Sequence, residues 1–204
     1  MKLFKDKELR DLIIAIIILS VILSFPGFTE LSSIDFLGVF LVSIVMVVFS
    51  YFVRELMHKF VARKFGCMST FKLWPPGILI GMMSMFLKNF VGYFGGKNIV
   101  FAAPGFAEIV PYRFGRMGFK VARVTPKDIG LVALAGTGIN VFFAVFFKMF
   151  PQGIFQTLGQ YNGLIALFNL IPISPLDGSK IFLWSMMTWL FLVFVSVLTV
   201  FVFA

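Results

Sequence analysis

The stretch Tyr51-Phe-Val-Arg-Glu-Leu-Met-His-Lys-Phe-Val-Ala-Arg-Lys64 decides most of the fold prediction, because it places charges at the end of a long apolar run. That run covers residues 36–53. Eighteen helical residues at about 1.5 Å each extend roughly 27 Å, close to the thickness of the hydrocarbon core of a bilayer. Arg54 and His58 lie one helical turn apart, with Glu55 about 100° around the helix from Arg54. We therefore expect a membrane-crossing helix with three polar residues near its inner end.

The composition indicates a membrane protein throughout. Of the 204 residues, 60% are hydrophobic and 29 are phenylalanine, and the mean hydropathy is +1.00. Charged residues make up 13%, about half the share usual in soluble domains. Apolar runs of spanning or nearly spanning length cover residues 12–25, 36–53, 129–147 and 181–204. The predicted fold class is an all-α polytopic membrane protein with about five or six spans.

The basic residues predict the orientation of the chain. The net charge is +9, but lysine and arginine lie beside apolar segments, so the expected partner is the lipid bilayer and not nucleic acid. Residues 1–11 form a mixed-charge flank, and no small-x-small cleavage site follows the first span, which is expected to be retained. The loop 28–35 contains acidic but no basic residues. This pattern predicts a multi-pass protein of the plasma membrane with a cytoplasmic N-terminus.

Residues 70–127 predict a different kind of structure. Trp74-Pro-Pro-Gly77 should break any helix, and a Pro104-Gly105 turn interrupts the later apolar segment. Basic residues lie at both ends, so residues 78–110 either cross the membrane twice or dip in and return. Apolar and basic residues roughly alternate over 119–125, which is typical of a strand. We expect this region to be re-entrant and partly β.

Two later predicted spans lead to a segment broken by prolines. The first, residues 128–150, is rich in small residues that let helices pack closely in lipid. The second, residues 154–171, ends in Asn169-Leu-Ile-Pro-Ile-Ser-Pro-Leu-Asp-Gly178, after which a final helix is expected to reach the C-terminus. Gly178 permits a left-handed turn. Asp177 then either projects toward the bundle interior or caps the final helix.

Arg54-Glu55-x-x-His58 has two interpretations on its own. Were residue 54 a histidine, the motif would be His-Glu-x-x-His, in which two imidazoles hold zinc and the glutamate transfers a proton. A membrane helix also commonly ends in charges, so an ordinary hydrated flank explains the same residues.

Taken together, the two segments resemble the site-2 protease family of intramembrane zinc metalloproteases. That family has His-Glu-x-x-His at the inner end of one span, and Asn-x-x-Pro followed by Leu-Asp-Gly on a later broken helix. Glu55 and His58 match the first motif. The residues that match the second are Asn169, Pro172, Leu176, Asp177 and Gly178.

Two shorter segments extend this resemblance. Residues 60–66 look like the family's continuation of the first motif, and Ala135-Gly136-Thr137 resembles its Ala-Gly-Pro, with threonine in place of proline. The resemblance covers about residues 36–185. It implies a site-2 protease-like helical core within one membrane-embedded domain, residues 1–204. In the family, a membrane-associated β-sheet that receives an extended substrate segment lies between these spans, which suits residues 70–127.

The resemblance also implies roles for individual residues. His58 and Asp177 would be zinc ligands, and Glu55 would be the general base for a zinc-bound water. Asn169 would orient the substrate or the oxyanion. Zinc is therefore the cofactor of the family. Transmembrane or membrane-adjacent protein segments are the expected partners.

Arg54 departs from the family pattern at the position of the other histidine ligand. A guanidinium stays protonated and offers donors only, so it cannot bind zinc. The chain has no second histidine, and its single cysteine, Cys67, is expected to be a small buried apolar residue. We expect zinc to be absent or weakly bound. The hypothesis is that Arg54 instead bridges Glu55, Asp177 or both, where zinc would lie.

Three functions follow from these residues. The first is a site-2 protease-like homologue, catalytically impaired or inactive, that binds transmembrane segments or membrane partners. The alternative is an active intramembrane zinc metalloendopeptidase with an altered metal site. A transporter would also use broken helices and intramembrane charges, but the sequence shows no repeat symmetry.

Overall fold

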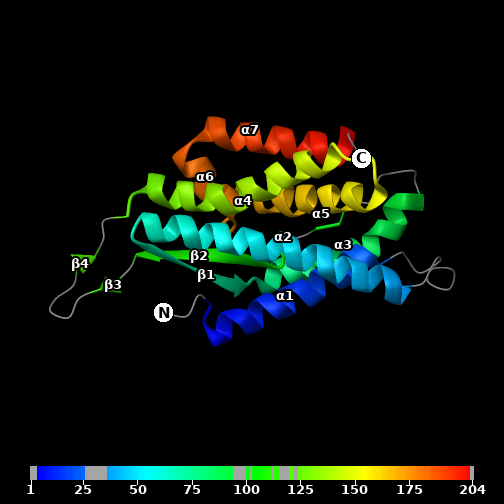
Figure 1. Ribbon diagram of the computed structural model, residues 1–204, viewed down its shortest axis with the longest axis horizontal. Helices are drawn as coiled ribbons and strands as arrows, with labels where there is room; N and C mark the ends of the chain where they lie inside the picture. Colours follow the sequence, from blue (N-terminus) through cyan, green and yellow to red (C-terminus); the bar gives the residue numbers. More distant parts are fainter. Residues whose placement is uncertain are drawn as a thin grey trace.

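The structure is a computed structural model that describes residues 4–25, 36–93, 100–101, 103–111, 113–114, 120–121 and 124–202. The described residues are mostly helical, with two small antiparallel sheets (Figure 1). The helices are α1 (Asp6–Ser24), α2 (Phe36–Lys64), α3 (Pro75–Tyr93), α4 (Pro126–Lys148), α5 (Gly153–Asn169), α6 (Asp177–Trp184), α7 (Met186–Val197) and the π-helix η1 (Leu198–Val202). The strands are β1 (Cys67–Leu73), β2 (Gly105–Pro111), β3 (Arg113–Phe114) and β4 (Lys120–Val121).

Helices α2, α4 and α5 lie side by side and form the centre of the molecule (Figure 1). Among the described helices, α2 and α4 are long and apolar enough to cross a membrane. On α2 some polar side chains are buried while large apolar ones are exposed: Val45 is 70% exposed, whereas Arg54, Glu55 and His58 are fully buried. The reverse holds for a helix on the surface of a soluble protein, so this distribution suits a helix surrounded by lipid.

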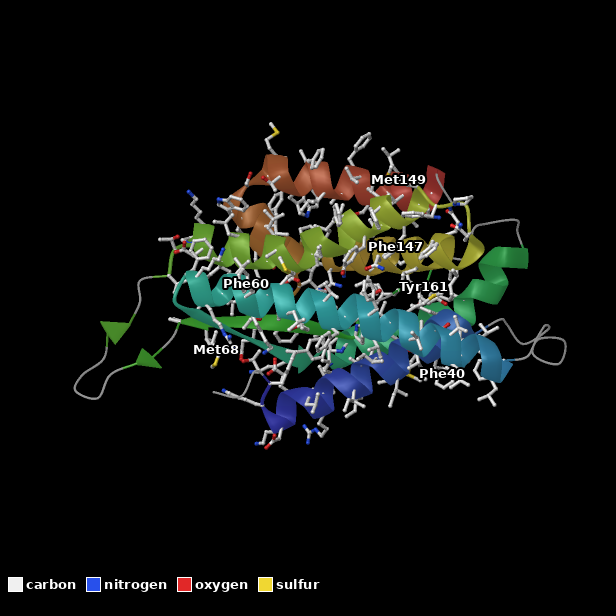
Figure 2. All side chains as sticks on the ribbon, in the orientation of Figure 1. Phe40, Phe60, Met68, Phe147, Met149 and Tyr161 are labelled. Carbon is white, nitrogen blue, oxygen red and sulfur yellow. The ribbon has the colours of Figure 1, made fainter. Side chains whose placement is uncertain are left out.

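The core between the helices is built of large apolar side chains with a few buried hydroxyls. Of the residues labelled in Figure 2, Phe60 and Met149 are exposed, whereas Tyr161 is only 9% exposed. Tyr161 forms a hydrogen bond with Ser43 of α2 over 2.9 Å. This bond satisfies two hydroxyls that would otherwise be left unpaired in an apolar surrounding.

The partly β character expected of residues 70–127 is confirmed. Strand β1 pairs antiparallel with β2, in a register that runs from Cys67 opposite Pro111 to Leu73 opposite Gly105. Gly66, at φ 66°, supplies the left-handed turn between α2 and β1. Of the strand expected over 119–125, β4 is described and pairs with β3, and most of the rest lies outside the described residues.

Two expectations about where helices begin are wrong. The proline pair after Trp74 does not prevent a helix, since α3 begins at Pro75, where a missing N–H is tolerated. Residues 6–11 are not a simple flank either, since they belong to α1 and bury Glu8. Glu8 Oε1 accepts from Lys59 Nζ at 2.5 Å and from Phe71 N at 2.9 Å. These bonds tie α1 to α2 and β1.

The final helix is not continuous, contrary to the sequence prediction. It breaks at Ser185, whose backbone is extended, with φ −152° and ψ 102°. The Ser185 side chain accepts from Thr188 N at 3.3 Å and so caps α7. Trp189 Nε1 donates to Leu170 O at 2.7 Å, which holds α7 against the end of α5. The break allows α6 to pack on α4 while α7 turns back along the bundle (Figure 1).

Candidate functional site

The two sequence motifs meet inside the bundle. Arg54, Glu55 and His58 lie on the inner face of α2, Asn169 ends α5, and Asp177 is the first residue of α6. All five side chains are fully buried. The structure therefore brings together residues that are more than a hundred positions apart in the sequence.

Arg54 lies at the centre of this cluster. Its Nη1 donates to Glu55 Oε1 at 2.6 Å, and its Nη2 donates to Asp177 Oδ2 at 2.5 Å. Nη2 also donates to Asn169 Oδ1 at 3.0 Å. The expectation that the guanidinium bridges the two carboxylates is confirmed. Short bonds between ionised groups are the strong kind, so this cation compensates both buried anions.

Close packing of the backbone next to Asp177 holds its carboxylate in the cluster. A left-handed turn at Gly178 was the wrong expectation, since Gly66 alone among the described glycines has positive φ. The requirement at Gly178 is space: a Cβ there would lie 2.1 Å from Leu170 O. Asp177 does not act as the N-cap of α6, which is Leu176. Its carboxylate instead accepts from Arg54 and from Thr137 Oγ1, the latter at 3.1 Å.

Two residues of α4 hold His58 in place, one through a hydrogen bond and one through close packing. Its Nδ1 lies 3.0 Å from Val132 O, and because a carbonyl can only accept, Nδ1 carries the proton. Its Nε2 lies 3.1 Å from Asp177 Oδ2 but forms no hydrogen bond of acceptable geometry within the described chain. The ring packs directly on Gly136, where an added Cβ would lie 2.0 Å from Nε2. Gly136 is therefore needed for the position of His58.

The fixed charges of the cluster balance. Asp177 Oδ1 accepts from Lys180 Nζ at 3.1 Å, so two cations, Arg54 and Lys180, face two anions, Glu55 and Asp177. Charged side chains close to the hydrocarbon core of a membrane are tolerated when they are paired in this way. A divalent cation added to this arrangement would need one of the present cations to leave or an anion to arrive.

Comparison with known proteins supports a protease-like ancestry. The chain is 33% identical over 195 residues to a Methanocaldococcus jannaschii protein named "Putative zinc metalloprotease MJ0611", covering 91% of this chain and 88% of the relative. The chain belongs to this zinc metalloprotease family. No family model and no solved structure matches the sequence.

The residues present do not fit the zinc site that the name of this metalloprotease family implies. A catalytic zinc is held by three protein ligands, and the described part of the chain contains no group of three histidine, cysteine or acidic side chains placed to hold a metal. His58 and Asp177 supply two candidate ligands. Asp177 Oδ2, however, already accepts from the guanidinium of Arg54. Cys67 is buried in β1, where its thiol donates to Phe65 O.

Three members of the cluster were not predicted from the sequence. In the sequence, Thr137 stands only as a replacement for proline, Lys180 belongs to neither motif, and the carbonyl of Val132 carries no sequence signal. The spacing of Lys180, three residues after Asp177, is the one signal that could have revealed an ion pair on α6.

Proposed function

We propose that the protein is a catalytically silent, site-2 protease-like member of the metalloprotease family that binds membrane segments of partner proteins without cutting them. The observation that carries this proposal is the Arg54 guanidinium, bound at once to Glu55, Asp177 and Asn169. These are the residues to which the family resemblance assigns the base, a metal ligand and the substrate-orienting amide. Each of them already has a charged hydrogen-bond donor.

The chemistry of the guanidinium explains why hydrolysis is not expected. Glu55 Oε1 already accepts a short hydrogen bond from a permanent cation, so this oxygen is not free to accept a proton from an attacking water. Asn169 has both amide atoms engaged, because Nδ2 donates to Ile165 O at 2.7 Å and Oδ1 accepts from Arg54. Arg54 cannot give up a proton to become a ligand. Zinc is therefore expected to be absent or weakly bound.

The binding half of the proposal is supported by a groove beside Asp177. It has a volume of about 500 Å³, with β2 on one side and the residues around α6 on the other. Among the described strands, β2 pairs with β1 alone, so its second edge offers backbone groups to an extended chain. We propose that a membrane-adjacent segment of a partner protein binds there.

We also propose that the chain is a multi-pass protein of the plasma membrane with a cytoplasmic N-terminus. The two long apolar helices and the inward-facing charges of α2 support the membrane location. The lack of basic residues in the loop 28–35 supports the orientation.

One observation favours an active enzyme as the second candidate. His58 Nε2 and Glu55 Oε2 are buried and have no hydrogen-bond partner among the described residues. Nε2 also faces Asp177 Oδ2. Two ligands and a base would remain in place if Arg54 moved away, which is the altered metal site of an active metalloendopeptidase.

Metal content separates the two candidates. We expect the purified protein, equilibrated with zinc in detergent, to retain well under one zinc ion per chain, and the Arg54→His variant to retain about one, since it supplies a third ligand. The double variant Arg54→His/His58→Ala should lose that zinc again. Cleavage of a transmembrane reporter is expected from Arg54→His alone. Stoichiometric zinc in the unmodified protein would overturn the silent interpretation.

A further inference from the structure

Lys180 connects the buried cluster to the groove. Its ammonium donates to Ala107 O of β2 at 2.6 Å and to Asp177 Oδ1 at 3.1 Å. The side chain is 17% exposed, and Ala107 is fully buried. Lys180 therefore touches the groove wall with one bond and the Arg54–Asp177 ion pair with the other.

The bond to Ala107 uses an acceptor that a docking chain would need. The donor comes from α6, and among the described strands β2 has β1 as its one partner. A polypeptide that extends a sheet donates its backbone N–H groups to edge carbonyls of this kind. As long as Lys180 holds Ala107 O, an incoming strand must compete with an ammonium for it.

Lys180 lies across the path that an incoming strand would take along the groove. Phe106, Ala107, Glu108 and Ile109 form one wall, and Ser179, Lys180 and Leu183 belong to the other. The lining is mostly apolar, and the β2 edge offers the backbone groups of a strand, which suits an extended polypeptide segment. Lys180 bridges the two walls.

We propose that Lys180 is a latch: it is a positioning residue that holds the β2 edge while the groove is empty and is displaced by the backbone of an extended segment. This inference rests on the proposed binding function. Asp177 explains how the latch works, because Oδ1 keeps the ammonium nearby after it leaves Ala107 O. Release is thus a change of one hydrogen bond, with the ion pair on α6 retained.

The test measures binding of one defined probe to the full-length protein in detergent. The probe is a fluorescein-labelled peptide of alternating threonine and valine with the seven-residue length of β2, followed by fluorescence anisotropy. Lys180→Met removes the competing donor and keeps the apolar stem, so it should bind the peptide about five-fold more tightly than the unmodified protein, the effect of one ordinary hydrogen bond. Lys180→Arg should bind like the unmodified protein, because it retains a cationic donor.

A matched probe and a second variant complete the test. The same peptide with methylated backbone nitrogens cannot donate to Ala107 O, so its affinity should not change on Lys180→Met. Lys180→Leu, which also lacks a side-chain donor, replaces Lys180→Met if the latter fails to fold. If the variant without a donor at position 180 bound the peptide equally or more weakly, the latch would be overturned. The proposed binding function would be unaffected by that result. Absence of binding to every variant would overturn the binding function and the latch with it.

Discussion

At the scale of single residues, the position of His58 depends on the absence of a side chain on α4. The imidazole fills the space where residue 136 would carry its Cβ, and it keeps its Nδ1 proton on Val132 O. On the other side of the ring, Nε2 lies 3.1 Å from Asp177 Oδ2, the carboxylate oxygen that also pairs with Arg54. The cluster therefore depends on Gly136 as strongly as on its charged members.

Gly136→Ala tests this dependence, with Gly138→Ala as its control on the same helix. An added methyl group at 136 would lie 2.0 Å from His58, whereas at 138 its nearest neighbour is Leu134 Cδ1 at 3.6 Å. We expect Gly136→Ala to lower the free energy of unfolding by about 1–3 kcal/mol, the usual result of overpacking. Gly138→Ala should raise it by about 0.5–1 kcal/mol, since alanine favours the helix. Unfolding in mixed micelles measures both, and equal effects would contradict the packing argument.

At the scale of elements, the sequence predicted the long helices well and their ends poorly. Hydropathy marks α2 and α4 because lipid requires long apolar runs. That Arg54, Glu55 and His58 of α2 and Thr137 of α4 are buried is a finding of the structure. The break at Ser185 was missed because one N-cap serine is a weak signal inside a long apolar run, and the bond from Trp189 to Leu170 joins two different helices. The buried position of Glu8 was missed for the same reason, since its partner Lys59 is 51 residues away.

Glu8→Gln tests how firmly α1 is attached to α2 and β1. The pair Glu8–Lys59 is 2.5 Å long and nearly buried, and Lys59 Nζ also donates to Ser69 O at 3.1 Å. Neutralising Glu8 leaves the Lys59 ammonium without its counter-ion, so we expect a loss of about 3–5 kcal/mol in the free energy of unfolding.

The matched control for this variant is Glu108→Gln. Glu108 pairs with Lys72 at 2.7 Å, but the two side chains are 38% and 49% exposed. Removal of a solvent-screened pair should change the free energy of unfolding by less than about 1 kcal/mol. If the two substitutions were equally harmful, burial would not be what makes the α1 contact strong.

At the scale of the whole molecule, the proposed membrane topology places the two ends of the bundle in different compartments. β1 follows the inner end of α2, whereas residues 149–152 connect α4 to α5 at the opposite end of the bundle. Lys64 at the end of α2 and Gln152 in the connection are both exposed and lie at these two ends. The positive-inside pattern assigns Lys64 to the cytoplasm and Gln152 to the other side.

Labelling with a membrane-impermeant maleimide tests this topology, because the native thiol should stay silent. Cys67 is fully buried, and burial, with a smaller contribution from Asp128, raises the pKa of its thiol. Less thiolate is then present near neutral pH, so alkylation of Cys67 should be slow and should quicken as the pH rises. Against this background, Gln152→Cys should react in intact cells, and Lys64→Cys should react only in inside-out vesicles. Labelling of both from the same side would contradict the proposed topology, and a Cys67→Ser variant checks that the signal comes from the introduced cysteines.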